Sequence, residues 1–330
     1  SDNSISGVAQ TPDGYLWVAT KGGMMRFNGK DFTPLPLREL PQLPSHAIRS
    51  MFLDRRGDLW LGMERGPLIQ LGKDSFRAYG VEDGIRPRRV LSRTDAPVGR
   101  MWIGYALDVC LLENGTVTRF GRDQGVPPGN DASLACDQDG QVWYANGGRL
   151  GTLSHAGFET VHHFGASPLK VTAARSGGLW LSVGSTLMQM APGAEPVPLA
   201  HLPPDTSVNV IYEDRDNAIW IGTFPNGLFR FHEGILEQIG TSHNGVDCIT
   251  QDREGNIWAG TSGGGLNQIR PRAVTLIGED RGLPFSSVQS VTTEHSGRIW
   301  AASRSGQLVV HDGDRWELQA LDGNLPDTKA

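Results

Sequence analysis

Short apolar segments alternate with turns rich in glycine, asparagine and aspartate along the whole chain. A turn ending in Gly or Asn is followed by an apolar residue, Trp, a second apolar residue and a small residue, as in Glu254-Gly255-Asn256-Ile257-Trp258-Ala259-Gly260. The same order surrounds Trp17 and Trp60 and recurs further along the chain. Eight of the nine tryptophans therefore occupy equivalent positions, 37 to 43 residues apart. A period of about 40 residues that tolerates small insertions indicates a repeated supersecondary unit.

Each repeat has the content of one propeller blade. In the first repeat the expected strands are Ile5–Thr11, Tyr15–Thr20, Met24–Phe27 and a segment around Phe32, and Asn28-Gly29 is a hairpin turn. Four short strands per repeat, without sustained helical periodicity, predict an all-β propeller of four-stranded blades. We expect a single propeller domain over residues 1–330, because stacked repeats form one continuous core. The expected repeats span about 1–42, 43–85, 86–127, 128–165, 166–204, 205–242, 243–284 and 285–330.

The tryptophans are interpreted as structural. The residues twelve and nine positions before the Trp are apolar in most repeats, as in Ile5 and Val8, which is typical of an innermost strand buried on both faces. Two residues after each Trp stands a small side chain, which we interpret as a recess for the bulk of the neighbouring blade. The structural set is Trp17, Trp60, Trp102, Trp143, Trp180, Trp220, Trp258 and Trp300.

Repeats three to five are the degenerate ones. Arg93, Asp131 and Pro168 replace an apolar residue of the first strand, and Gly147-Gly148 and Gly184-Ser185 shorten the loop after the Trp strand. Two interpretations stay open: drift in a tolerant fold, or reshaping of these blades into a binding edge.

Composition limits the partners. A net charge of −6 and a pI near 5.8 provide no electrostatic footprint for nucleic acid or for an anionic membrane surface. Hydrophobic runs are short and interrupted, so we expect no membrane contact by this segment. The chain opens directly at a repeat, as expected of a mature or trimmed segment of a longer protein.

No residue set predicts metal binding or catalysis. The widely separated Cys110, Cys136 and Cys248 are interpreted as small core residues. His162-His163 is a poor metal pair, because adjacent strand residues point to opposite faces, and an exposed outer strand is expected there. The recurrent Asp54, Asp137, Asp214 and Asp252 precede turns, where their carboxylates can accept local backbone N–H groups. We therefore expect no cofactor, no metal and no enzyme activity in this segment.

A candidate ligand-binding face follows from the strand order. The loop before the first strand and the loop after the Trp strand of a blade should open on the same face, where variable loops on a rigid scaffold are expected to bind. The candidate ligand-binding residues are Lys21, Glu64, Arg65, Arg88, Arg89, Tyr105, Asn130, Asn146, Phe224, Asn244, Ser262 and Arg304. Guanidinium groups are the best donors in this set, so binding should be lost when Arg88, Arg89 and Arg304 are changed to Ala.

The repeats resemble those of the two-component regulator propellers. The resemblance is carried by Asp252-Arg253-Glu254-Gly255-Asn256-Ile257-Trp258-Ala259-Gly260-Thr261 and by the interblade segment Gly278 to Val288. It implies an extracytoplasmic, periplasmic sensor region of a bacterial membrane receptor whose output is a histidine kinase, a hybrid response regulator or a diguanylate cyclase. No such output domain is encoded in this segment.

Blade number departs from the family pattern. Related receptors often place about fourteen repeats in two seven-bladed rings, whereas this segment holds eight. Eight blades could close together, or seven could close with one extra blade left over.

Two functions from different classes are weighed. The resemblance implies a non-catalytic sensor module that binds a small molecule, for example a glycan fragment, and signals to its own receptor domains. The alternative is a protein-binding or dimerisation scaffold with a homodimer partner. A lyase-like or lactonase-like enzyme is a third and weaker alternative, because such propellers place acidic residues or a histidine and a metal at the central opening.

Overall fold

The computed structural model divides into two compact units, residues 1–271 and residues 272–330. It describes residues 3–35, 47–73, 75–86, 90, 92–96, 99–130, 132–270, 277–279, 282–294, 296–312 and 315–319. The described secondary structure is almost entirely antiparallel β-sheet, with two short 3-10 helices, η2 (Val81–Asp83) and η3 (Arg122–Gln124). The all-β prediction is therefore confirmed.

The first four sheets each contain four consecutive strands. Blade one holds β1 (Ile5–Gln10), β2 (Leu16–Thr20), β3 (Gly23–Phe27) and β4 (Phe32–Leu35). Blade two holds β5 (Ile48–Leu53), β6 (Leu59–Met63), β7 (Leu68–Leu71) and β8 (Phe76–Tyr79). Blade three holds β9 (Ser92–Ala96), β10 (Arg100–Gly104), β11 (Val109–Glu113) and β12 (Thr116–Phe120). Blade four holds β13 (Ser133–Cys136), β14 (Val142–Asn146), β15 (Arg149–Ser154) and β16 (Gly157–His163).

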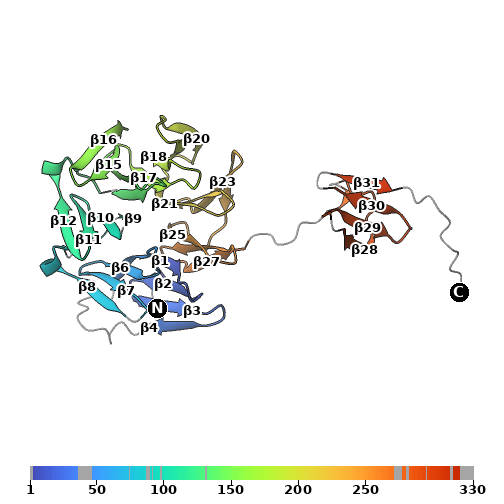
Figure 1. The fold of residues 1–330 in the computed structure, drawn as a ribbon, viewed down its shortest axis with the longest axis horizontal. Coiled ribbons are helices and arrows are strands. Elements are labelled where there is room, and N and C mark those ends of the chain that lie inside the picture. Colours follow the sequence, from blue (N-terminus) through green and yellow to red (C-terminus); the bar gives the residue numbers. More distant parts are fainter. Residues whose placement is uncertain are drawn as a thin grey trace. The chain divides into compact units, whose positions relative to one another are not determined.

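The remaining sheets follow the same order (Figure 1). Blade five holds β17 (Leu169–Ala173), β18 (Leu179–Val183), β19 (Thr186–Met190) and β20 (Val197–His201). Blade six holds β21 (Ser207–Glu213), β22 (Ile219–Phe224), β23 (Leu228–His232) and β24 (Ile235–Ile239). Blade seven holds β25 (Val246–Gln251), β26 (Ile257–Thr261) and β27 (Leu266–Ile269), and residues 271–276 after it lie outside the described residues. The second unit holds blade eight, with β28 (Val288–Thr293), β29 (Ile299–Ser303), β30 (Leu308–His311) and β31 (Trp316–Gln319).

The seven blades of the first unit close into a ring. Strand β1 contacts β25 and β26, and Figure 1 shows β1 beside β25. The Ser4 hydroxyl donates a hydrogen bond to the Ser262 carbonyl oxygen at 2.9 Å, and the Arg253 guanidinium donates to the Pro12 carbonyl oxygen at 2.6 Å. Of the two predicted arrangements, the contacts are those of a seven-bladed ring with one extra blade.

The structure divides the expected single domain over residues 1–330 into two compact units. In blade one, Ile5 and Val8 are buried in one cluster with Trp258 of blade seven. Apolar burial is the main force that holds blades together, so this cluster joins the two ends of the first unit.

The small residue after each Trp receives the innermost strand of the next blade. A Cβ atom built on Gly260 would lie 2.6 Å from Cγ2 of Ile5, and one built on Gly222 would lie 2.9 Å from Cγ1 of Val246. Contacts this short leave no room for a larger side chain. The predicted recess exists at these two positions, and an aliphatic side chain of the neighbouring blade occupies it.

Each recurrent aspartate joins its turn to the tryptophan six residues later. One oxygen of the Asp214 carboxylate accepts the backbone N–H groups of Asp216 and Ala218, and the other accepts the indole N–H of Trp220 at 2.7 Å. The predicted backbone bonds are thus confirmed, and the indole bond is an addition. The same indole bond is made by the pairs Asp54–Trp60, Asp137–Trp143 and Asp252–Trp258.

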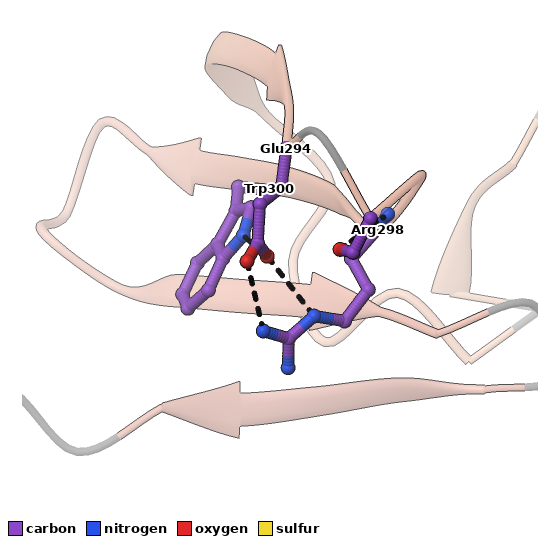
Figure 2. Close-up of polar contacts among 4 residues, drawn as sticks. Glu294, Arg298 and Trp300 are labelled. Carbon is purple, nitrogen blue, oxygen red and sulfur yellow. Dashed lines mark hydrogen bonds and ion pairs between the residues drawn. The ribbon is translucent and has the colours of Figure 1, made fainter.

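Blade eight uses a longer acid at this position. Figure 2 shows the Glu294 carboxylate between the Trp300 indole and the Arg298 guanidinium, with the indole nitrogen 3.3 Å from Oε2. Arg298 donates two hydrogen bonds to the same carboxylate, at 3.0 and 3.1 Å. Five of the eight structural tryptophans are buried, and Trp17, Trp143 and Trp300 are half-buried.

Candidate functional site

The two sets of loops predicted to share a face do share it. The backbone N–H of Gly129, before blade four, donates to Ala106 O in the loop after the blade-three Trp strand at 3.1 Å. The N–H of Gly227, after the blade-six Trp strand, donates to Asn244 O at 2.9 Å. We call the side of the ring that carries these loops the Trp-loop face.

A cavity of about 930 Å³ runs along the ring axis. Residues from the innermost strands of all seven blades line it, including Val8 of blade one, Thr94 of blade three and Ile249 of blade seven. Each of these strands begins at the Trp-loop face and ends at the opposite one. The cavity is thus the place on the ring where side chains from every blade converge.

Four innermost strands of the ring carry a β-bulge directly after their first apolar residue. The ladder between the innermost strand and the Trp strand shifts register there in blades one, two, six and seven. A bulge leaves one residue unpaired and changes the direction of its side chain. The bulged residues are Ser6, Arg49, Asn209 and Asp247, and all four line the cavity at its Trp-loop mouth.

Hydrogen bonds hold these side chains in place. The Asn209 amide donates to Asp247 Oδ1 at 3.1 Å, and the Ser262 hydroxyl donates to Asp247 Oδ2 at 2.7 Å. The Arg49 guanidinium lies 2.6 Å from Glu64 Oε1, and its hydrogen bond lowers the pKa of the Glu64 carboxyl. The mouth therefore combines fixed donors, acceptors and both signs of charge.

The opposite mouth is occupied by contacts between blades. Arg215 donates its guanidinium to the carbonyl oxygen of Asp252, as Arg253 does to that of Pro12. The amide oxygens of Gln251 and Gln10 accept the backbone N–H groups of these same arginines. These polar groups are used for assembly of the ring, so the Trp-loop mouth is the better candidate site.

The predicted ligand-binding residues are placed unevenly. Lys21, Arg65, Asn130, Phe224 and Asn244 are exposed, whereas Glu64 and Ser262 are half-buried. Arg88 and Arg89 lie outside the described residues. Arg304 is exposed and belongs to the second unit.

Two of the candidate ligand-binding residues, Tyr105 and Asn146, are buried. Tyr105 is 2% exposed, and desolvation by burial raises its pKa. It packs in one cluster with Trp60 and Ile85. Asn146, the last residue of β14, is fully buried, and its amide donates to Pro127 O at 3.0 Å and to the Tyr144 hydroxyl at 2.9 Å.

The cavity residues Arg49, Lys170, Asn209 and Asp247 were missed by sequence reasoning. A signal was present: in each case one polar residue follows the first apolar residue of an innermost strand, as in Ile48-Arg49 and Val246-Asp247. We interpreted these strands as buried on both faces. No residue pattern in the sequence predicted the bulge that turns one residue toward the axis.

The histidine pair lies on the outermost strand of blade four, as expected. His163 is exposed, and His162 packs against Phe164 and lies 3.4 Å from Glu195. Among the described residues no group of three or more His, Cys, Asp or Glu side chains could hold a metal ion. Within the same residues no helix has the length and apolar character to cross a membrane.

The chain is similar in fold to two extracellular domains from B. thetaiotaomicron. It is 21% identical to that of the hybrid two component system BT3049, with a TM-score of 0.69 over 96% of this chain and 47% of that chain. It is 17% identical to that of the one component system BT4673, with a TM-score of 0.70 over 98% of this chain and 46% of that chain. The chain thus spans about half the length of these domains.

A lyase has the same fold. Virginiamycin B lyase from Staphylococcus aureus is 16% identical, with a TM-score of 0.68 over 81% of this chain and 95% of that chain. No curated protein sequence matches this chain significantly.

A family model confirms the repeats. The model described as two component regulator propeller matches residues 1–22, 42–65, 202–224 and 240–263. These segments are the beginnings of blades one, two, six and seven, which are also the blades of the ring with a bulged innermost strand. Four repeats of the chain therefore match the repeat of the two-component regulator propeller family.

Proposed function

We propose that this chain is the ligand-sensing part of a bacterial signal-transduction receptor. In this proposal it lies outside the cytoplasm, performs no catalysis, binds a small polar molecule such as a glycan fragment and signals to an output domain elsewhere in the receptor. The family repeats and the fold shared with extracellular domains of signalling systems support the signalling role. The likeness to the lyase concerns the fold alone, and one fold hosts many functions.

One observation carries the choice of site. Bulges in four blades direct polar side chains to the mouth of an axial cavity of about 930 Å³, which is within the size range of small-molecule sites, about 300–1,000 Å³. Bulges are common next to functional sites because they change the direction of one side chain without disturbing the sheet. Arg49, Asn209 and Asp247 would contact the ligand.

A scaffold function is the second candidate, and one observation favours it. Phe224, at the end of β22, and Leu107, in the loop after β10, lie on the Trp-loop face and are 53% and 52% exposed. Exposed apolar side chains on one face are typical of protein contacts.

A thermal-shift screen of the chain against oligosaccharides and small metabolites tests the sensor proposal. A ligand of the folded state raises apparent stability, by about 2.7 kcal/mol at a hundredfold excess over its dissociation constant. Arg49→Met should weaken the effect of any hit, whereas Arg230→Met should not, because Arg230 pairs with Glu237 outside the cavity. Absence of any hit, combined with concentration-dependent self-association in analytical ultracentrifugation, would favour the scaffold.

A further inference from the structure

Blade five differs from the other blades at the small residue after the Trp. That position holds Gly or Ala in seven repeats and serine only in blade five. The eight residues are Ala19, Gly62, Gly104, Ala145, Ser182, Gly222, Gly260 and Ala301. A hydroxyl therefore stands where the next blade packs in the rest of the molecule.

The Ser182 hydroxyl is directed into a groove. The residue is 2% exposed, and its hydroxyl makes no hydrogen bond with the described residues. It lines a cavity of about 280 Å³ between blades five and six, together with Pro168 and Val208. Buried polar groups are nearly always hydrogen-bonded, so an unpaired hydroxyl facing a groove is suited to a bound partner.

The register of blade five places a positive charge beside this hydroxyl. The innermost strand β17 has no bulge, and Lys170 pairs directly with Ser182. Residues directly opposite on antiparallel strands have side chains on the same face of the sheet. Lys170 lines both this groove and the axial cavity, so the two spaces adjoin at its side chain.

A short turn leaves the groove open. Only Gly184-Ser185 separates β18 from β19, whereas Pro225 to Gly227 separates the corresponding strands of blade six. On the other wall the Asn226 amide donates to the Thr206 hydroxyl at 2.7 Å, which fixes that loop. The shortened loop noted in the sequence of this repeat thus accompanies a groove at this junction.

We propose that this groove binds the carboxylate of a small ligand. The Ser182 hydroxyl would donate a hydrogen bond to it, and the Lys170 ammonium would supply the opposite charge. Charge-assisted hydrogen bonds of this kind are short and strong. The inference rests on the proposed sensing function, and it assigns the chemistry of one end of the ligand.

The exposed carboxylate of Asp205 also lines the groove and opposes an anion. Its backbone φ of 60° is a conformation that asparagine adopts readily. Asp205→Asn therefore removes the opposing charge without straining the loop, and it should increase the affinity for a carboxylate.

Isothermal titration calorimetry of the 330-residue chain tests the proposal with D-glucuronate, succinate and D-glucose. The first two carry carboxylates on a sugar and on a non-sugar, and glucose is the neutral match of glucuronate. We expect at least one carboxylate to bind and glucose to bind about tenfold more weakly or not at all. Which of the two binds identifies the source of the carboxylate.

Three variants localise the binding. Ser182→Ala should fold, because alanine occupies the same position in three other repeats, and it should weaken carboxylate binding several-fold. Lys170→Met should weaken it by about tenfold, the value of one charge-assisted contact. Arg230→Met removes a charge outside both the groove and the axial cavity and serves as the control.

The outcomes separate this inference from the proposed function. Equal binding of glucose and glucuronate, no binding of either carboxylate at millimolar concentration, or unchanged carboxylate affinity in Ser182→Ala and Lys170→Met would overturn the groove assignment. The sensing proposal would survive each of these results if another ligand raised thermal stability. It fails only in the broader thermal-shift screen.

Discussion

The indole N–H of Trp180 has no hydrogen-bond acceptor among the described residues, because Ala174 stands six residues before it where four other blades have aspartate. Ala174 is 1% exposed, and the equivalent Asp214 is 5% exposed. Ala174→Asp should therefore raise the free energy of unfolding, by about 1 kcal/mol, by supplying the missing acceptor. Urea unfolding measures the change. The gain should disappear in a Trp180→Phe background, which has no indole N–H, and an equal gain there would refute the explanation.

Trp258 holds the junction between blades seven and one. It is 7% exposed and packs in one cluster with Ile5 and Val8. Trp258→Ala should cost about 3–5 kcal/mol of unfolding free energy, as for other buried aromatic truncations. The half-buried Trp300 of the second unit is the comparison, and Trp300→Ala should leave the unfolding transition of the ring unchanged. A cost below about 1 kcal/mol for Trp258→Ala would contradict its buried position.

Titration of the Cys110 thiol should make the free energy of unfolding depend on pH in the alkaline range. Burial, aided by the Asp108 carboxylate, raises the pKa of its thiol from 9.0 to about 12. Between these values the unfolded chain releases the proton and the folded chain retains it. Stability from this group is therefore complete below pH 9 and falls as pH rises, by about 1.4 kcal/mol per pH unit.

Cys110→Ser removes this titration with a small change in volume. Chemical unfolding at a series of pH values should show a shallower alkaline loss of stability for the variant than for the wild type. The exposed fraction of Cys248 is larger, so Cys248→Ser is the control and should keep the wild-type slope. Parallel curves for the wild type and Cys110→Ser would contradict the prediction.

Glu294 should titrate below the ordinary glutamate range. The hydrogen bonds from Arg298, and next that from Trp300, lower the pKa of its carboxyl (Figure 2). Because the folded-state pKa is depressed, the contribution of these contacts is present above the unfolded value of 4.5 and is lost as pH falls through the folded value. An NMR titration of the carboxyl carbon measures this midpoint. Arg298→Ala should move it upward more than Trp300→Phe does, and the reverse order would contradict the assigned causes.

The sequence was sufficient for the blades because their signal is local and repeated. Trp220, the turn before it and the small Gly222 lie within one short segment, so eight copies define eight sheets. Closure of the ring has no such local signal, because it depends on whether Ile5 of blade one packs against Gly260 of blade seven. The residues near Ile5 and near Gly260 in the sequence do not indicate this contact, so the choice between seven and eight blades required the structure.

The candidate site was harder to predict for a related reason. Asn146 and Arg65 both follow a repeat tryptophan within a few residues, at the end of β14 and just after β6, yet one is fully buried and the other is exposed. Burial of a loop residue depends on the adjacent blade, which lies about 40 residues away in the chain. Lys170 illustrates the same limit, because a missing bulge decides which neighbour its side chain meets.

The ring also has a consequence for the order of its parts. Every described strand pairs within a sheet of consecutive strands, so none of the described strands completes a blade at the other end of the chain. The junction between blades seven and one is held by side-chain packing and by hydrogen bonds such as that from Arg253 to Pro12. Its neighbours are held by the same kinds of contact, as from Arg215 to Asp252. A circular permutation that starts the chain at another blade would therefore preserve the contacts between blades. The order of the repeats in the sequence, and not the packing of the blades, sets which blade comes first.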